Sequence, residues 1–590
     1  MEIITEQGEH FDVPADYSFD FEFINPMLSE VGSQTAPGTL PYTTRNLKLL
    51  DYPQRFDRAK KYLIKRNVLL RVGTFQKRAT QAVLKANEKD KIVTTFYMDE
   101  AIFYEKIKDV QMGAVNYGGT RTGTVRELFN LCSDVMFNRR VDDFHLFPVV
   151  AGFDGKKYTS GIWLNKIRID PDTKAVSLWD QSTSQIEIDG TMVDVPFGFG
   201  ITAFLKVSFV IKKIIEHFGY SVGESVFESD VSFKQLVLVN NVADAIVGGV
   251  LDYTQLLPTC NVSDFILALQ KKFGLVFICD DTKKTISVTL IDDNISREPD
   301  VDLTRFAAEL PRIEWHDNEQ LKISAKTSIT SAAPPCELLS DLVAKYGAIT
   351  LLKNDYGIQT NGKLYYVAPE NTIYRRYYAE GHIAASLQRF SPYFNYYSSK
   401  NKMMVEYASD DEQLPMFRNR IKMTKSDGND VYNFFYVPTV PEIILLNSSL
   451  VKEGDDIDNS KTTADIKMMF CFKVPELQKE KNSGTLISMG TTVKYDYPGE
   501  IWGNWSLRIA GEDGLYERFW RKYDMMIQSS NQTIYCNLNL TLSQLQMLNI
   551  CTPKLLFNQP VLIERIKCKI GIDKFEITEA VFRTLREYQD

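Results

Sequence analysis

The sequence predicts a mixed, β-rich α+β fold divided among several domains, and three observations support this prediction. The chain has 590 residues, whereas a single hydrophobic core rarely grows beyond roughly 250 to 300 residues. Its aromatic content is 12%, with 35 Phe and 29 Tyr, and aromatic side chains suit the pleated surface of a sheet. The hydrophobic period changes from two to 3.6 near residue 201, and strand-like alternation returns after residue 466. We therefore expect three to five domains.

The first predicted domain covers residues 1–110 and consists of an N-terminal arm followed by a β-barrel. Residues 1–45 are rich in Pro and Gly and show little periodicity, which indicates an ordered arm or a loop over a barrel. Residues 68–72 and 91–97 are short β-type runs separated by a polar stretch. These runs predict a small antiparallel barrel or sandwich.

Residues 111–200 are predicted to form a β-hairpin-rich insertion, because the segment is glycine-rich and strand-like. Two apolar, alternating runs over residues 162–169 and 175–179 flank a turn signal at Asp170. This pattern predicts a hairpin.

Residues 201–300 are predicted to form a small α+β domain. Apolar residues at helical spacing predict one helix over residues 207–218, which ends at Gly219, and a second over residues 262–273, which ends at Gly274. The same segment contains a predicted strand and a predicted hairpin, over residues 236–239 and 275–290.

Residues 301–440 are predicted to form a mixed α/β domain with a segment rich in Tyr and Arg, and residues 441–590 a C-terminal β-rich domain. Alternating apolar residues predict strands over residues 534–540 and 566–570. Between them, Thr541-x-x-Gln544 has the form of a capping box and predicts the start of a short helix.

Composition argues against several classes of protein. The chain has 68 basic and 76 acidic residues, a net charge of -8, which is the wrong sign for tight binding of nucleic acid. The first ten residues are acidic and have no signal-peptide pattern. No apolar stretch approaches the ~18 residues of a membrane span. We therefore expect a protein made in the cytoplasm, without a membrane span.

The eight cysteines are widely dispersed, and no C-x-x-C pair occurs among them. Because no export signal is expected either, we predict that the thiols are free and reduced.

Catalytic motifs have only weak counterparts in the chain. The five His residues show no H-E-x-x-H spacing, and the nucleophile elbow G-x-S-x-G does not occur. The glycine-rich segment at residues 118–124 lacks the G-K-[ST] ending of a phosphate loop, and the acidic segment at residues 453–458 lacks the glycine and final Glu of a calcium loop. Both are better interpreted as surface loops. Two S-x-x-K matches, at Ser399 and Ser449, have no companion motif. We predict no catalytic residue, no metal ligand and no cofactor.

A segment dense in Tyr and Arg is the most informative feature without catalytic character. We call it the Tyr/Arg belt, and its candidate interface residues are Tyr374, Arg375, Arg376, Tyr377, Tyr378, Arg389, Tyr393, Tyr396 and Tyr397, with Tyr365, Tyr366 and Phe394 nearby. Tyr and Arg are enriched in protein interfaces. An ordinary sheet core explains the composition about equally well, since Tyr also packs inside sheets. A nucleic-acid stacking surface is a third interpretation, disfavoured by the acidic net charge.

Several segments resemble large tail proteins of phages and prophages from anaerobic gut bacteria. The opening Asn25-Pro26-Met27-Leu28-Ser29-Glu30-Val31-Gly32-Ser33-Gln34-Thr35, with Leu40-Pro41, Asn46, Leu49-Leu50 and Tyr52-Pro53-Gln54-Arg55 after it, is similar to theirs. So are the helix that ends in Phe218-Gly219-Tyr220, the segment from Leu257-Pro258 to Phe277, and Gly514-Leu515-Tyr516-Glu517-Arg518-Phe519-Trp520. The similarity is therefore spread over most of the chain.

The resemblance implies a baseplate or tail-tip hub. Such a protein would have β-barrel domains like those of tail-tube proteins, interleaved with small α+β domains, and would form a homotrimeric ring. Its implied partners are the tube, distal tail, tape measure and tip or fibre proteins, and DNA would pass through the ring without specific binding. The implied location is the virion tail, assembled in the host cytoplasm.

Two alternatives from other functional classes remain open at this point. A tail-borne hydrolase of the cell wall would need two carboxylates facing each other across a cleft. Some relatives in the resembled family carry a peptidase or lysozyme domain, but the corresponding motifs are not visible in this sequence. A carbohydrate-binding adhesin would use the Tyr/Arg belt as a stacking platform. The expected protein is not an enzyme.

Overall fold

The structure is a computed structural model. It describes residues 2–14, 17–28, 34–55, 65–73, 75–86, 91–98, 100–151, 162–182, 185–188, 191–315, 319–326, 336–338, 342–344, 347, 350–352, 364–367, 372–376, 386–392, 403–414, 416–441, 443–446, 465–479, 486–492, 506–507, 509, 514–530, 532–571 and 575–585. Within these residues, no helix is both long and apolar enough to cross a membrane.

The largest sheet has twelve strands and unites the two ends of the chain. Its central pairing is antiparallel between β2 (Ser18–Ile24) and β38 (Gln559–Gly571), where Phe21 lies opposite Cys568. The order is β1 (Glu2–Thr5), β5 (Lys65–Val72), β6 (Phe75–Ala86), β7 (Lys91–Tyr97), β3 (Gln34–Thr35), β2, β38, β39 (Phe575–Thr584), β36 (Gln532–Tyr535) and β22 (Arg312–Trp315), with β4 (Gly38–Pro41) on β7 and β37 (Lys554–Leu556) on β38.

One hydrophobic core lies against this sheet and contains residues from both ends of the chain. Phe19 and Phe21 pack in it with Ile566 and Cys568, all at most 2% exposed. The helices α1 (Thr44–Leu49) and α13 (Leu542–Met547) contribute to the same core. The capping box predicted at Thr541 is confirmed, because its side chain accepts from the Gln544 N–H and the Gln544 side chain accepts from the Thr541 N–H.

A second body, the central α+β layer, confirms most of the elements predicted between residues 201 and 300. Two helices, α4 (Val207–His217) and α7 (Val262–Phe273), precede Gly219 and Gly274, whose φ angles are +81° and +60°. A Cβ at position 274 would lie 2.8 Å from the Phe519 carbonyl oxygen. The glycine at this helix end therefore also permits the close approach of the Phe519 backbone. The accompanying elements are β17 (Ser221–Ser225), β20 (Leu275–Asp280), β21 (Thr285–Leu290), α2 (Glu100–Ile107), α5 (Val226–Ser229), α6 (Val231–Lys234) and α8 (Ile291–Ile295).

A five-stranded sheet packs on these helices and collects strands from distant parts of the chain. Its order is β35 (Gly490–Thr491), β32 (Phe470–Lys473), β18 (Leu236–Leu238), β16 (Phe204–Lys206) and β9 (Phe144–His145). The predicted strand at residues 236–239 is therefore confirmed as β18, and Phe470 from β32 enters the core around α7. The helices α11 (Leu515–Phe519) and α12 (Arg521–Ser529) complete that core.

The hairpin predicted around Asp170 is confirmed, but its first strand is shorter than expected. Strand β12 (Ile167–Ile169) pairs with β13 (Val176–Leu178), whereas residues 162–164 form β11 in another sheet. The break lies at Asn165, whose φ is +51° and whose backbone N–H donates to the Gly200 carbonyl at 2.6 Å. The sheet around β11 has the order β11 (Ile162–Leu164), β10 (Val149–Ala151), β31 (Asp430–Val440) and β30 (Met416–Thr424).

Three elements differ from the sequence-based expectations. Residues 1–45 supply strands β1 to β4 of the large sheet and are not only an arm or a covering loop. The polar stretch between the two predicted strands is the strand β6, in which residues 79–83 are all buried whereas Gln76, Arg78 and Lys85 are exposed. Helix α3 (Val125–Met136) lies within the segment predicted to be hairpin-rich, and the Thr124-x-x-Glu127 capping box marks its start.

The remaining strands form smaller sheets. These are β8 (Arg121–Thr122) with β19 (Val250–Leu251), β14 (Gln185–Ile188) with β15 (Thr191–Asp194), β23 (Glu319–Lys326) parallel to β29 (Met403–Glu412), and β33 (Gln478–Lys479) with β34 (Leu486–Ile487). A five-stranded antiparallel sheet has the order β24 (Cys336–Leu338), β28 (Ser386–Pro392), β27 (Thr372–Arg376), β26 (Leu364–Val367) and β25 (Thr350–Leu352). The short 3₁₀ helices within the described part of the chain are η2 (Met112–Ala114), η3 (Tyr253–Leu256) and η4 (Thr304–Phe306).

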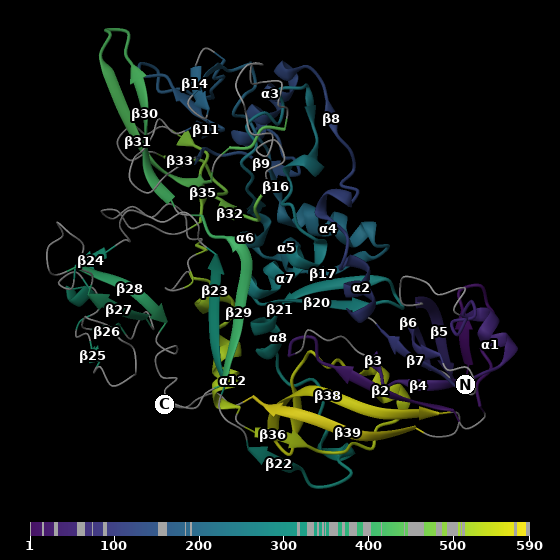
Figure 1. Ribbon diagram of the computed structural model, residues 1–590. Helices are drawn as coiled ribbons and strands as arrows, with labels where there is room; N and C mark the ends of the chain where they lie inside the picture. Colours follow the sequence, from purple (N-terminus) through teal and green to yellow (C-terminus); the bar gives the residue numbers. More distant parts are fainter. Residues whose placement is uncertain are drawn as a thin grey trace.

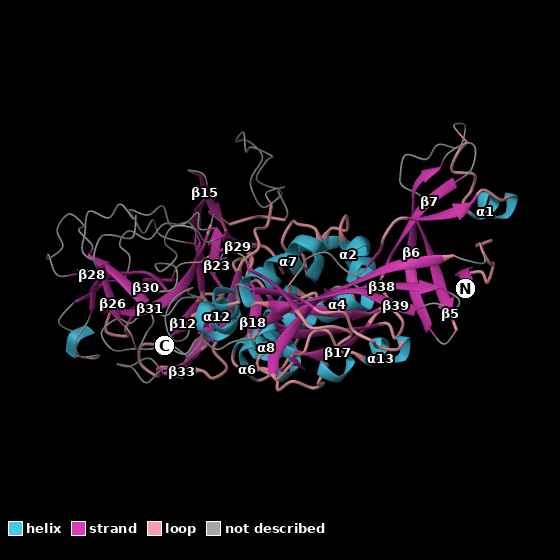
Figure 2. Cartoon of the chain, turned by 90° about the horizontal axis from the view of Figure 1, so that it is seen from below, coloured by secondary structure: helices cyan, strands magenta, loops and turns pink. Residues whose placement is uncertain are grey.

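The molecule is elongated. Figure 1 shows the purple and yellow strands of the twelve-stranded sheet below the central helices, and the green hairpin β30–β31 at the opposite end. In Figure 2, β5, β6 and β7 lie at one end of the molecule and β26 and β28 at the other. The predicted coarse fold, a β-rich α+β protein with several sheets, is confirmed. The predicted domain boundaries at residues 110, 200, 300 and 440 stay predictions, and the first and last of these domains share the large sheet.

Candidate functional site

The Tyr/Arg belt lies in the five-stranded sheet β24–β28 as far as the structure describes it. Tyr374 on β27 is opposite Tyr365 of β26 on one side and opposite Arg389 of β28 on the other. These three residues therefore occupy one row across three strands, although 24 residues of chain separate the first from the last. Arg375 and Arg376 follow on β27. The other predicted interface residues lie outside the described residues, namely Tyr377, Tyr378, Tyr393, Tyr396 and Tyr397.

The sequence segments weighed as possible ligand loops have structural roles or are not described. The Gly-rich segment at residues 118–124 leads into helix α3, where the Glu127 N–H donates to Thr124 Oγ1 and the Thr124 N–H donates to the Glu127 carboxylate. His217 accepts a hydrogen bond from the Asn116 N–H at 3.3 Å. The acidic segment at residues 453–458 and the S-x-x-K matches at Ser399 and Ser449 lie outside the described residues.

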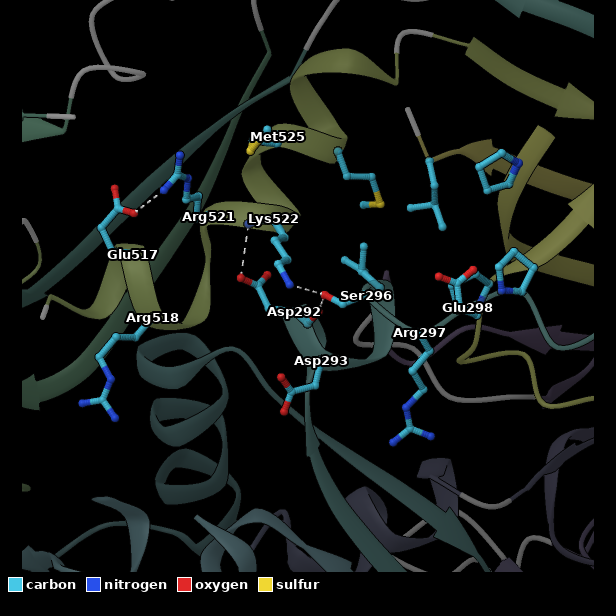
Figure 3. A pocket seen from close by; sticks show the side chains of 16 residues that line it. Asp292, Asp293, Ser296, Arg297, Glu298, Glu517, Arg518, Arg521, Lys522 and Met525 are labelled. Atoms are coloured by element: carbon cyan, nitrogen blue, oxygen red, sulfur yellow. Dashed lines mark hydrogen bonds and ion pairs between the residues drawn. The ribbon is translucent and has the colours of Figure 1, made fainter. Parts of the chain in front are cut away.

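A cleft that sequence reasoning missed lies where the central layer meets the C-terminal strands. It has a volume of ≈ 810 Å³. Its lining combines charged and apolar side chains, and Figure 3 labels the charged ones. The charged residues are Asp292, Asp293, Arg297, Glu298, Glu517, Arg518, Arg521 and Lys522, and the apolar residues include Ile295, Pro299, Met525, Met526, Pro553, Pro560 and Leu585.

Among the charged residues of the cleft, Asp292 lies in the first turn of helix α8. Its carboxylate accepts from the backbone N–H groups of Lys522 at 3.2 Å and Tyr523 at 2.9 Å. These N–H groups lie in the first turn of α12, where a helix has no internal acceptors. Burial raises the pKa of Asp292. The carboxylate therefore fixes α12 on α8 across 230 residues of chain.

The neighbouring charges are also engaged in contacts within the molecule. Lys522 Nζ donates to Ser296 Oγ at 2.6 Å, and Arg521 pairs with Glu517 at 3.0 Å. Arg518 donates to Ser232 Oγ at 2.7 Å. Asp292 and Glu517 thus hold helices α8, α11 and α12 together.

A buried ion pair joins the central layer to β29. Lys272 of α7 and Asp411 of β29 are 2% and 1% exposed, and their charged atoms are 2.6 Å apart. Ser409 also donates to the Asp411 carboxylate. Because both charged groups are buried away from water, removal of either one would leave the other as an unpaired buried charge and would destabilise the fold.

A polar cluster surrounds the half-buried His145 at one end of the sheet that contains β9 and β16. The Nε2 atom of His145 is buried and has no hydrogen-bond partner within the described residues. Burial, with the nearby charges of Lys206 and Lys473, lowers the pKa of His145 to about 2. Lys473 donates to Asn138 Oδ1 at 2.6 Å. Burial and the two nearby cations therefore favour the neutral form of His145 in the folded protein.

This cluster predicts a loss of stability in acid. The unfolded chain protonates His145 near pH 6.5, while the folded chain does not, so stability due to this residue falls as the pH drops below 6.5. We expect His145→Gln to reduce the loss of unfolding free energy between pH 7 and pH 5 by about 2 kcal/mol. Urea unfolding of both proteins at the two pH values measures this. An equal loss in both proteins would contradict it.

None of the seven cysteines whose surroundings the structure describes forms a disulfide, and Cys336 is described only as part of strand β24. Among the described residues, no group of three His, Cys, Asp or Glu side chains is placed to hold a metal ion. No protein-family model matches the chain, and a comparison with curated proteins finds no match.

Proposed function

We propose that the chain is a structural subunit of a phage tail, a baseplate or tail-tip hub that forms a ring and joins the tail tube to the host-recognition proteins. The observation that carries the proposal is the row of Tyr365, Tyr374 and Arg389 across adjacent strands. A row of these residue types has the composition of an interface anchor. The sequence resemblance spread over most of the chain supports the same function.

The architecture is compatible with a protein that works by geometry. The strand-rich molecule is elongated, and its largest sheet is open, with β1 and β22 as the two ends of the strand order (Figures 1 and 2). We propose that this sheet supplies the tube-like wall when subunits associate through heterologous contacts into a closed ring of three. The proposed partners are the tube, distal tail, tape measure and tip or fibre proteins, and the proposed location is the virion tail.

The net charge of -8 supports passage of DNA without retention. Like charges discourage adhesion of a polyanion to the wall of a channel. The proposed role needs no catalytic group, metal or cofactor.

The belt provides a direct test of this function. We expect wild-type protein to form threefold rings in negatively stained electron micrographs and trimers in native mass spectrometry. Replacing Arg375, Arg376, Tyr377 and Tyr378 together by Ala should abolish most of this assembly while the monomer stays folded, because a few anchors carry most of an interface's energy.

The matched control removes exposed cations from turns outside the belt. Lys174 and Lys425 are both exposed, and their replacement by Ala should leave assembly intact. Circular dichroism of all variants reports folding. Normal assembly of the quadruple variant, or its unfolding, would remove the belt from the interface. Wild-type protein that stays monomeric at all concentrations, or that clears peptidoglycan in a zymogram, would overturn the ring proposal.

A further inference from the structure

Strand β22 ends the order of the twelve-stranded sheet (Figure 1). It pairs on one side with β36, with Ile313 opposite Ile534. Within the described residues, no strand pairs with its other side. All four residues of β22 are exposed. As far as the chain is described, the sheet therefore presents an edge whose backbone groups can pair with another extended chain.

The apolar face of the sheet continues onto this edge without cover. Opposite residues in an antiparallel pair point to the same face, and Ile534 is buried in the core of the sheet. Ile313 lies on that face, and so does Trp315 two residues later. Nevertheless, Ile313 is 46% exposed and Trp315 is 69% exposed. A partner that lengthens the sheet would cover both.

The other face of β22 is charged, with one group of each sign. Arg312 and Glu314 are 3.5 Å apart, and both side chains are more than half exposed. The Arg312 guanidinium also lies 4.5 Å from the centre of the Tyr535 ring. Arg312 lies one residue before Ile313 and Glu314 lies one residue after it. The strand can therefore pair antiparallel with a copy of itself so that opposite charges meet.

One antiparallel register of two copies places opposite charges across from each other. If a two-fold axis passes at Ile313, Arg312 of each copy is opposite Glu314 of the other, and Pro311 is opposite Trp315. Opposite charges at such positions are stabilising, whereas like charges are destabilising. A shift by two residues places Glu314 opposite Glu314, and a shift by one residue reverses the faces. The charge pattern therefore selects a single register.

We infer that β22 is an association edge for a second copy of this chain, paired antiparallel about a two-fold axis at Ile313. The contact is isologous, so it joins copies in pairs and is separate from the heterologous contacts that close a ring. A four-residue strand buries far less than the ~1,600 Å² of a standard stable interface. The association should therefore depend strongly on protein concentration.

A disulfide trap tests the axis. In this register residue 313 faces its own copy at a Cβ separation of roughly 4.5 to 5.5 Å, and a modest approach allows a disulfide. We expect oxidised Ile313→Cys to run as a dimer on a non-reducing gel. Val141→Cys is the control, because Val141 is 88% exposed and lies in a loop; this variant and wild type should stay monomeric on the gel. An Ile313→Cys band no stronger than the control would overturn the inference.

A charge swap tests the register. Sedimentation velocity over a concentration series should show at least tenfold weaker pairing for Arg312→Glu. The double variant Arg312→Glu with Glu314→Arg should recover pairing, since the swapped charges are again opposite. If the single change weakens pairing and the double variant does not recover it, β22 pairs with a different strand and the inference fails. Rings in electron micrographs without a disulfide dimer would reject this contact alone and leave the hub proposal intact.

Discussion

Replacing Lys272 by Met should lower the free energy of unfolding by about 3 to 5 kcal/mol, because it leaves the Asp411 carboxylate buried without its counter-charge. The two charged atoms are 2.6 Å apart, and neither side chain is more than 2% exposed. The pair joins helix α7 to strand β29, so its loss should also loosen the contact between these elements. Urea unfolding followed by circular dichroism measures the change.

Two variants separate the cost of an unpaired charge from the loss of a contact. The double variant Lys272→Met with Asp411→Leu should regain most of the stability, since apolar side chains of similar volume often replace a buried pair at little cost. Lys283→Met is the exposed control, because Lys283 is 78% exposed and pairs with Asp280 at the surface. It should change the unfolding free energy by less than about 1 kcal/mol. A double variant as unstable as the single one would show that the charges are not the cause.

Replacing Phe265 by Ala should cost about 3 to 5 kcal/mol of unfolding free energy, because a large buried side chain is lost and a cavity remains. Phe265 is fully buried on α7. The helix packs on β20, as predicted from the sequence, and it also packs on β32. The Phe265 and Phe470 rings are stacked with centroids 6.3 Å apart.

Phe557→Ala is the matched control for this substitution. Phe557 is 37% exposed in the turn between β37 and β38, so its loss should change the unfolding free energy by only about 0.5 kcal/mol. Thermal and urea unfolding of both variants give the comparison. A Phe265→Ala protein as stable as Phe557→Ala would mean that α7 does not carry the central core.

Local patterns in the sequence predicted the elements that depend on local physics. The helices before Gly219 and Gly274 have their apolar residues at helical spacing and end where a left-handed backbone is required. The β20–β21 hairpin and the capping box at Thr541 were predictable for the same reason. Helix α3 was missed although Thr124 and Glu127 form a capping box that could have located it.

The candidate sites followed less closely from the sequence. The composition of the Tyr/Arg belt was visible, but the alignment of Tyr365, Tyr374 and Arg389 in one row depends on strand register. The cleft around Asp292 was not predictable, since its partner N–H groups lie 230 residues later. Apolar alternation shows that a strand has an inner face, but it does not show whether that face is covered, as at Trp315.

The sequence by itself determined the β-rich composition, the positions of α4, α7 and the β20–β21 hairpin, and the presence of the Tyr/Arg belt. These depend on periodicity, on glycine at helix ends and on residue type, all of which act over a few residues. Only the tertiary structure decided that β2 pairs with β38 across more than 500 residues, that Lys272 meets Asp411, and that β22 is left as an open edge. Many strands in such a chain offer similar alternating faces, so their pairing is selected by the packing of the whole core and not by any local signal.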